Sequence, residues 1–255
     1  MGKIITVSIL GCGSRGAWAY GAFMNQLKDK YKIVSLCDTD AYARAHVSES
    51  FDVDAKNVFA DENEFFKEKR SELLIIATQD KDHVRQAKVA LSLGYNLLLE
   101  KPISKYLNEL KELKEYAEKY NRTVIVCHVL RYSVQIRKLM EIINSGRIGR
   151  IISIQHLEQV AFFHQAHSFV RGNWRREDES APMIMAKCCH DLDLLQALAG
   201  SKCKRVSSMG SLAFFNKENA PEGSADRCIN CKYVDTCEYS AKTIYLKWWQ
   251  EAGRP

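Results

Sequence analysis

Three glycines follow an apolar run near the start of the chain, in the segment VSILGCGSRG. Glycine permits a tight turn, a close approach of the backbone to a ligand, and close packing of a helix on a strand. We therefore predict that Gly11 makes the turn, that Gly13 lets the backbone approach a pyrophosphate, and that Gly16 packs against the strand. The amide groups at the start of the next helix would then point at the phosphates.

An acidic residue stands where a ribose-binding carboxylate is expected. Asp38 follows a second apolar run, KIVSLC, about 20 residues after Gly16, which is the offset of the acid that binds the ribose diol in dinucleotide sites. A carboxylate at this position repels a 2′-phosphate, so the pattern favours NAD over NADP. The alternative for Asp38 is that it caps a helix. Arg15 is either an added positive charge in the loop or an ordinary exposed arginine.

The first half of the chain alternates short apolar runs with longer segments of helical periodicity. This order is typical of an α/β fold with a doubly wound parallel sheet, in which helices cover both faces. Helices are expected where apolar residues recur at helical spacing before Gly94 and before Asn121. The expected strands cover residues 4–10, 32–37, 73–77, 96–99 and 123–127.

After His128 the pattern changes, which divides the chain into domains over residues 1–128 and 129–255. The second part begins with an expected helix over 135–144 and a strand-like segment, GRIISIQHLEQV. A loop rich in aromatic and basic residues follows, and then a single apolar helix over about 182–199. Another strand is expected beyond Lys204, before a polar loop with three cysteines.

The composition argues against several classes of protein. The formal net charge is +6, but lysines alternate with glutamates, as in KYLNELKELKEYAEKYNR, which indicates a solvated helix face and no nucleic-acid partner. No apolar run approaches the roughly 18 residues of a membrane span, and the chain starts without an export signal. We expect a cytoplasmic protein with no membrane partner, whose cysteines in apolar runs, such as Cys37 and Cys127, are reduced.

Cys228, Cys231 and Cys237 form a C-x2-C-x5-C pattern in the polar loop. Two cysteines at the first spacing can share one metal ion, and three thiolates need a fourth ligand. That ligand would come from another cysteine, at position 188, 189 or 203, or from an earlier histidine. A structural zinc, an iron–sulfur centre and free or redox-active thiols all stay open.

Three further segments resemble the Gfo/Idh/MocA oxidoreductases, the family of glucose-fructose oxidoreductase and inositol dehydrogenase. They are IIATQDKDHVRQAKVALSLGYNLLLEKP, HVLRYSVQIRKLMEIINSGRIGRI and KCCHDLDLL. The resemblance implies an N-terminal Rossmann domain and a C-terminal α+β domain with an open, mostly antiparallel sheet. It also implies a nicotinamide-dependent enzyme that acts on a sugar, cyclitol or related polyol, and homo-oligomers that pair through the open sheet. Because members are usually longer, we expect a truncated chain with an incomplete second sheet.

The resemblance also assigns roles to residues. Lys101, in EKP, and His190, in CHDLD, match the family's catalytic lysine and histidine. An ammonium at the carboxyl end of a strand can hold the reacting oxygen while hydride moves, and a histidine suits proton exchange near neutrality. The alternatives are a surface lysine at a turn and a satisfied core histidine. The remaining cofactor-binding residues that the resemblance implies are Ser14, Thr78, His83 and Glu100.

One position departs from the family pattern. Many relatives carry an aspartate four residues before the histidine, where this chain has Ala186. Lys187 stands three residues before His190, near its face of the helix, so we predict that this lysine takes over the function of the acid. Asp193 is a better candidate than Asp191 to share the face of the histidine and bind substrate.

The loop AHSFVRGNWRRED has the residue types of a sugar-binding wall. Trp174 offers an apolar platform, while Arg171, Arg175 and His167 supply directed hydrogen-bond donors. Such a set suits a polyol or an acidic sugar. The alternative is an exposed basic loop.

Three functions fit these observations. The first is a dehydrogenase or reductase that transfers hydride between NAD and a carbinol carbon. The second is a glycosidase that uses bound NAD transiently, which the altered acid–base set at Ala186 favours. The third is a nucleotide-sensing regulatory protein without turnover, against which the presence of both Lys101 and His190 argues.

Overall fold

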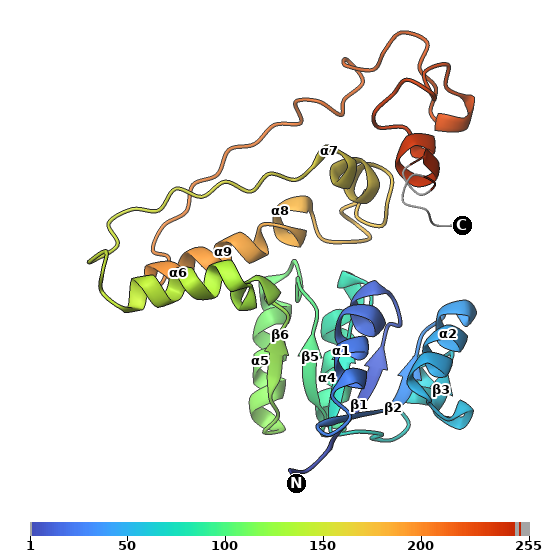
Figure 1. Ribbon diagram of the computed structural model, residues 1–255, viewed down its shortest axis with the longest axis vertical. Helices are drawn as coiled ribbons and strands as arrows, with labels where there is room; N and C mark the ends of the chain where they lie inside the picture. The colour runs from blue at the N-terminus through green and yellow to red at the C-terminus, as the bar shows by residue number, and fades with distance from the viewer. Residues whose placement is uncertain (1, 248–249, 251–255) are drawn as a thin grey trace. The chain divides into compact units, whose positions relative to one another are not determined.

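A computed structural model describes residues 2–247 and 250 of the chain. The chain forms two compact units, Met1–Val134 and Gln135–Pro255. The first unit contains a sheet with helices on both faces, and the second contains helices joined by long extended segments (Figure 1). In the described part of the chain, no helix is both long enough and apolar enough to cross a membrane.

The sheet of the first unit has the strand order β3-β2-β1-β4-β5-β6, and each neighbouring pair is parallel. The order reverses between β1 and β4, so the sheet is doubly wound as predicted. The five predicted strands are present, and β3 was missed because two residues leave no periodic pattern. The strands are β1 (Ile5–Leu10), β2 (Tyr31–Cys37), β3 (Val58–Phe59), β4 (Leu73–Ile76), β5 (Asn96–Leu99) and β6 (Val124–Val126).

Two hydrophobic cores, one on each face of the sheet, hold the helices of this unit. Because successive residues of a strand point to opposite faces, Leu74 and Ile76 of β4 lie in one core and Ile75 lies in the other. The first core packs against α4 and α5, and the second packs against η1 and α2. The helices are η1 (Ser14–Gly21), α1 (Ala22–Gln26), α2 (Ala41–Phe51), η2 (Ala55–Asn57), α3 (Glu62–Phe65), η3 (Asp80–Asp82), α4 (His83–Ser92), α5 (Leu107–Lys119) and η4 (Val129–Tyr132).

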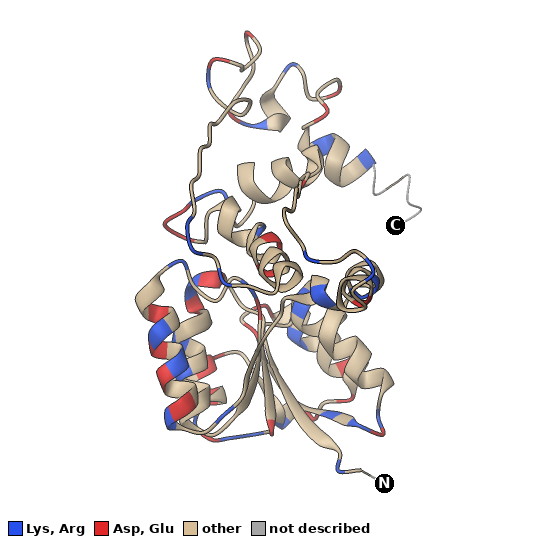
Figure 2. Cartoon of the chain, turned by 90° about the vertical axis from the view of Figure 1, so that its left-hand side faces the viewer, with Lys and Arg blue, Asp and Glu red and all other residues tan. Residues whose placement is uncertain are grey.

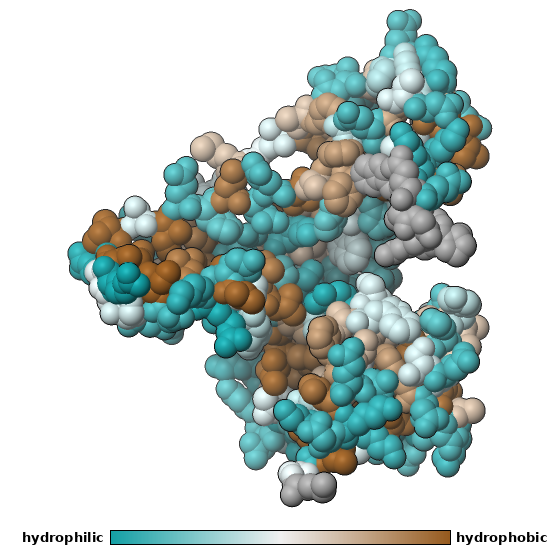
Figure 3. Space-filling model, in the orientation of Figure 1, coloured by the Kyte–Doolittle hydropathy of each residue, from teal (hydrophilic) through white to brown (hydrophobic). Residues whose placement is uncertain are grey.

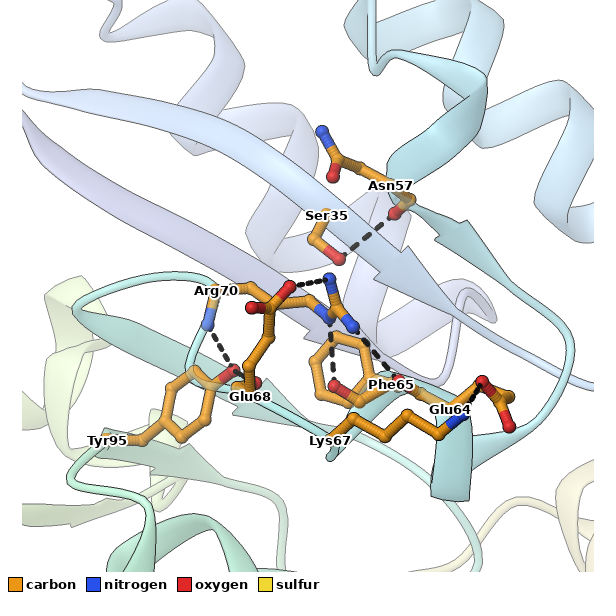
Figure 4. Close-up of polar contacts among 8 residues, drawn as sticks. All are labelled: Ser35, Asn57, Glu64, Phe65, Lys67, Glu68, Arg70 and Tyr95. Carbon is orange, nitrogen blue, oxygen red and sulfur yellow. Dashed lines mark hydrogen bonds and ion pairs between the residues drawn. The ribbon is translucent and has the colours of Figure 1, made fainter.

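Arg70 anchors the segment between α3 and β4 (Figure 4). Its backbone N–H donates to the Tyr95 hydroxyl oxygen at 2.7 Å, and its Nη1 donates to the Glu68 carboxylate at 2.9 Å. Its Nε and Nη2 donate to the carbonyl oxygens of Phe65 and Glu64 at 2.9 and 3.0 Å. The guanidinium group can satisfy both carbonyls at the end of α3 because its donors form a planar fork. Arg70 therefore fixes the chain that leads into the central strands.

The second unit is helical where it is regular. The strands expected over 149–160 and beyond Lys204 do not form in the described residues: both segments are extended chain, because neither has a neighbouring strand to pair its backbone groups. The single helix expected over about 182–199 is two helices. The elements are α6 (Val134–Asn144), α7 (Phe162–His164), η5 (Gln165–Val170), α8 (Met183–Ala186), α9 (Cys189–Ala199), η6 (Cys228–Asn230) and η7 (Lys242–Lys247).

The surface carries mixed charge and, in the second unit, exposed apolar side chains. Figure 2 shows acidic and basic residues interspersed along the helices, as the alternation of lysine and glutamate predicts. Figure 3 shows apolar residues gathered over α6 and the chain that follows it. Leu139, Ile148 and Ile152 are among the exposed ones. The second unit thus leaves more apolar surface uncovered than isolated surface residues would explain.

Candidate functional site

A cavity of about 630 Å³ lies in the first unit, at the carboxyl ends of β1, β2 and β4. This is the edge at which open α/β sheets bind ligands, next to the point where the strand order reverses, and the volume suits a small molecule. Four of the predicted cofactor residues line the cavity: Gly11, Gly13, Asp38 and Thr78. The other six, which do not line it, are Ser14, Arg15, Gly16, His83, Glu100 and Lys101.

The three glycines have three different environments. Gly11 has a φ of +94°, and a Cβ atom there would lie 2.5 Å from the Ala77 carbonyl oxygen, so the turn requires glycine. A Cβ on Gly16 would lie 2.0 Å from the Gly11 carbonyl oxygen, which confirms the predicted close packing. A Cβ on Gly13 would meet no atom within 4 Å, so its exposed side is open to a ligand.

The helix after the glycines differs from the expected α-helix. It begins as a π-helix, η1, and becomes α-helical only at α1. Short π-helical turns are frequent at functional sites. The backbone N–H of Ala17 already donates to the Gly13 carbonyl oxygen at 3.1 Å, so the amides left for a ligand are those that precede it.

Asp38 is held at the cavity wall by the glycine loop. Its Oδ2 accepts a hydrogen bond from the Cys12 backbone N–H at 2.6 Å, and its Oδ1 accepts one from the Asp40 N–H at 2.8 Å. The helix-capping alternative belongs to the neighbouring acid instead. Asp40 caps α2, accepting from the backbone N–H groups of Tyr42 and Ala43 at 2.8 and 3.1 Å.

A chain of polar side chains, of which the sequence analysis named only Thr78, continues the cavity wall. Thr78 Oγ1 donates to Gln86 Oε1 at 2.5 Å, and Gln86 Nε2 donates to Glu62 Oε2 at 2.7 Å. Arg85 pairs with Glu62 at 2.5 Å and with Asp82 at 3.0 Å. Arg85 and Gln86 lie between the core residues of α4. The helical periodicity that marks those core residues could therefore also have located Arg85 and Gln86 in the sequence. Glu62 lies on the four-residue helix α3, which is too short to leave a pattern.

Arg15 is exposed and pairs with a buried acid, a partner that the sequence did not reveal. Its Nε donates to Oε1 of Glu100 at 2.7 Å, and its Nη2 donates to the Tyr20 hydroxyl at 2.6 Å. Tyr20 in turn donates to the same Glu100 oxygen at 2.6 Å, while Oε2 accepts from the Lys101 backbone N–H at 2.9 Å. Burial by itself raises the pKa of Glu100, but the hydrogen bonds from Tyr20 and Arg15 outweigh it and hold the pKa below its ordinary value. The carboxylate thus stays charged and braces the segment that carries Lys101.

His83 is a buried bridge rather than part of the cavity wall. It is 1% exposed, with Nδ1 at 2.9 Å from the Pro102 carbonyl oxygen and Nε2 at 3.3 Å from the Thr78 carbonyl oxygen. The histidine therefore ties the end of β4 to the segment after Lys101. Lys101 itself is half-buried and follows the carboxyl end of β5, as expected from the sequence, and the Lys101–Pro102 peptide bond is cis.

The single helix that was expected to carry both Lys187 and His190 is interrupted between them. The backbone leaves the helix at Lys187, whose φ of −110° departs from the helical value near −63°, and α9 begins only at Cys189. The His190 N–H donates to the Lys187 carbonyl oxygen at 3.1 Å, a tighter turn than an α-helix makes. One tight turn, and not a continuous α-helix, therefore relates the two residues. Asp193 lies on α9 and is half-buried, and Asp191, which the sequence analysis ranked second, is the buried acid of this helix.

The loop predicted as a sugar-binding wall is partly helical, in α7 and η5. Arg171 is turned into its own unit: its Nε donates to the Ala166 carbonyl oxygen at 3.1 Å and its Nη2 to that of Tyr239. Trp174 is half-buried, and Arg175 is exposed, with Nη1 donating to the Gly172 carbonyl oxygen at 3.2 Å. Of the predicted donors, Arg171 thus serves as a structural clamp.

The three cysteines of the polar loop are not gathered into a metal centre. All nine cysteines of the chain lie within the described residues, and none of them is in a disulfide bond. Among the described residues, a different group has the proximity that a metal ion needs. One ligand atom from each of His156, Glu158 and Asp191 lies within 4.8 Å of those of the other two. Backbone N–H groups of Ala225 and Tyr233 do lower the pKa of Cys231, and so favour its thiolate.

Comparison with known proteins identifies the class. Residues 5–128 match a family described as "Oxidoreductase family, NAD-binding Rossmann fold", and residues 140–248 match its "C-terminal alpha/beta domain". These matches cover most of the chain, which therefore belongs to the Gfo/Idh/MocA oxidoreductase family. The doubly wound sheet and the cavity at its carboxyl edge are those of its NAD-binding domain.

Individual relatives are similar at low identity. YteT of Bacillus subtilis (strain 168) is 25% identical over 252 residues, covering 94% of this chain and 57% of YteT. A protein named 1-carboxy-3-chloro-3,4-dihydroxycyclo hexa-1,5-diene dehydrogenase, from Comamonas testosteroni, is 24% identical over 255 residues, covering 97% of this chain and 62% of the relative. The structure of scyllo-inositol dehydrogenase from Lactobacillus casei, with bound NAD(H) and scyllo-inositol, has 19% identity and a TM-score of 0.66, covering 78% of this chain and 57% of that one. The chain thus spans about three fifths of the length of the relatives it matches.

Proposed function

We propose that this chain binds NAD and transfers hydride between its nicotinamide ring and a carbinol carbon of a sugar, cyclitol or related polyol. The observation that carries the proposal is the cavity at the reversal of strand order, where Gly13 has an open side and Asp38 is fixed by the glycine loop. These residues fit a dinucleotide, because backbone amides of the glycine loop would hold the pyrophosphate and the Asp38 carboxylate would accept from the ribose diol. When bound, the cofactor supplies or accepts the hydride.

Lys101 is the residue that we propose to hold the reacting oxygen. Its ammonium would stabilise negative charge on that oxygen as hydride leaves or arrives at the carbon. Glu100 is a positioning residue, because its buried carboxylate accepts from the Lys101 backbone N–H while Arg15 and Tyr20 fix its other oxygen. His83 supports the same segment from the opposite side, through the Pro102 carbonyl oxygen.

The charges around the cavity support NAD over NADP. Asp38, Asp61, Glu62 and Asp82 all line it, and the guanidinium of Arg85 is already paired with two of these acids. A 2′-phosphate would therefore meet a surplus of negative charge. We expect NADP to bind more weakly than NAD.

The second unit would supply the remaining groups. We propose that His190 exchanges a proton with the substrate hydroxyl, that Lys187 takes the place of the absent acid, and that Asp193 contacts substrate. Trp174 and Arg175 remain candidates for binding a polyol, and Arg171 would hold their loop in place. The bound ligand of the Lactobacillus casei relative is scyllo-inositol, a cyclitol, which places this class of compound first among those to test. Exposed apolar side chains such as Ile152 would support pairing between copies of this chain.

The experiment is to follow NADH formation by absorbance across a panel of cyclitols, sugars and sugar acids. We expect turnover with at least one compound, and a decrease in kcat of about 100- to 1,000-fold in Lys101→Ala. The matched control, Lys111→Ala on the exposed face of α5, should retain wild-type turnover. Turnover that Lys101→Ala leaves unchanged would refute the proposed role of this lysine. Tight NAD binding without turnover on any compound would favour the regulatory alternative instead.

A glycosidase that uses NAD transiently is the second candidate. Ala186 favours it, since this buried position carries no acid and the proton-transfer groups therefore differ from the family pattern. Aryl glycosides separate the two functions. Release of the chromophore without net formation of NADH would support the glycosidase, and its absence would exclude this candidate.

A further inference from the structure

An extended segment of the second unit lies against the first turn of α9 through three polar side chains. His156 and Glu158 come from the segment, and Asp191 comes from the helix. One ligand atom from each residue lies within 4.8 Å of those of the other two. Side chains at positions 156 and 158 point to the same side of an extended chain, which explains how both reach the helix.

Asp191 has a buried oxygen that nothing in the described structure satisfies. The residue is 6% exposed, and its Oδ1 lies 2.5 Å from Nε2 of His156. Its Oδ2 is buried and has no hydrogen-bond partner. A buried carboxylate oxygen without a partner loses its hydration and gains no hydrogen bond or ion contact in exchange. Such an atom in a folded protein therefore indicates a missing water molecule or ion.

The three side chains match the ligand set of a transition-metal ion. One imidazole nitrogen and two carboxylate oxygens are ligands that Zn²⁺ accepts at about 2.0–2.2 Å, and three protein ligands leave one position open. Ligand atoms around tetrahedral zinc lie about 3.4 Å apart, so small side-chain rotations within the observed 4.8 Å would complete the site.

We propose that His156, Glu158 and Asp191 bind one divalent transition-metal ion of the Zn²⁺ class. The ion would give the orphaned Asp191 oxygen a partner and would tie the segment over residues 149–160 to α9, the helix that begins beside His190. This site is separate from the cysteine loop and does not depend on the proposed hydride transfer. Its role is to hold an extended segment that has no neighbouring strand among the described residues.

The test uses the full chain in a background without the other candidate metal ligands. The triple variant Cys228→Ser, Cys231→Ser and Cys237→Ser is dialysed against a chelator and titrated with Zn²⁺ by calorimetry. We expect one ion per chain, and an increase in the thermal unfolding temperature on saturation. Glu158→Gln and His156→Ala should each weaken binding by at least about 100-fold, more than the loss of a supporting outer-shell residue.

Two controls keep the result interpretable. Glu141→Gln, on the exposed face of α6, removes a carboxylate of the same unit and should leave binding unchanged. Glu158→Gln removes an exposed side chain, so it should preserve the fold, which circular dichroism checks. The proposal is overturned if the triple variant binds no Zn²⁺, or if it binds Zn²⁺ as tightly after either substitution. In both cases His156 and Asp191 form a hydrogen-bonded pair only.

Discussion

Arg15 donates to Glu100 at 2.7 Å, and this contact joins the glycine loop after β1 to the end of β5, where Lys101 follows. The two residues are far apart in the sequence, and the side chain of Arg15 is 45% exposed while that of Glu100 is 6% exposed. Hydrogen bonds through Glu100 therefore link the glycine loop to the backbone of Lys101, the proposed catalytic lysine. A change at either residue should affect both.

Glu100→Gln should destabilise the chain at neutral pH by about 1–3 kcal/mol, because the neutral amide loses charge-assisted hydrogen bonds from Arg15 and Tyr20. The pKa of Glu100 is lowered in the folded state, so its contribution is present above the ordinary pKa of 4.5 and is lost as the pH falls through the folded value. The difference from wild type should therefore shrink below pH 4.5. Urea denaturation over a pH series measures it, with Glu115→Gln on α5 as the control. A difference that does not change with pH would contradict this account.

Gly16→Ala and Gly13→Ala should separate folding from binding. The alanine Cβ at 16 would lie 2.0 Å from a backbone oxygen, so we expect a loss of about 3 kcal/mol of stability, the upper part of the range for overpacking. At position 13 the Cβ meets no atom within 4 Å, so stability should be unchanged while NAD binding weakens. Thermal unfolding and NAD calorimetry distinguish the two. Unimpaired NAD binding in Gly13→Ala would show that the pyrophosphate lies elsewhere.

Asp38→Asn should weaken NAD binding by about tenfold or more, because a charged hydrogen-bond acceptor for the ribose diol is lost. It should also narrow the preference for NAD over NADP, since the repulsion of a 2′-phosphate falls with the carboxylate. The amide keeps one acceptor oxygen for the Cys12 N–H, which limits the effect on folding. Dissociation constants for both cofactors provide the measurement. Equal weakening for NAD and NADP would mean that the residue supports the loop and does not select the cofactor.

Arg70→Ala should cost about 2 kcal/mol of stability and leave NAD binding unchanged. The substitution removes the side-chain donors that satisfy the carbonyl oxygens of Phe65 and Glu64. Lys69→Ala, at the exposed neighbouring position, is the control and should behave as wild type. Denaturant titration compares the three proteins. If Arg70→Ala binds NAD more weakly under conditions in which the variant is fully folded, this result would contradict a purely structural role.

The amino-acid sequence was sufficient for those parts of this protein in which a short stretch contains the whole pattern. Residues 4–10 and 73–77 read as buried strands because a strand between two helical layers is apolar on both faces. Gly11 and Gly16 could be assigned their roles because a turn and a close packing contact both exclude a Cβ atom. The motifs around Lys101 and His190 placed the chain in its family in the same way.

The contacts between distant segments could be found only in the folded chain. The partner of Arg15 stands on another strand end, the helix after residue 182 breaks at Lys187, and Asp191 rather than Asp193 is buried, against His156. None of these leaves a local signal, because the choice of partner for a polar group depends on which other segments the fold brings within hydrogen-bond distance. The periodicity of a sequence indicates which face of a helix or strand is buried. Whether a charged side chain on that face can be buried depends on the partner that another segment supplies.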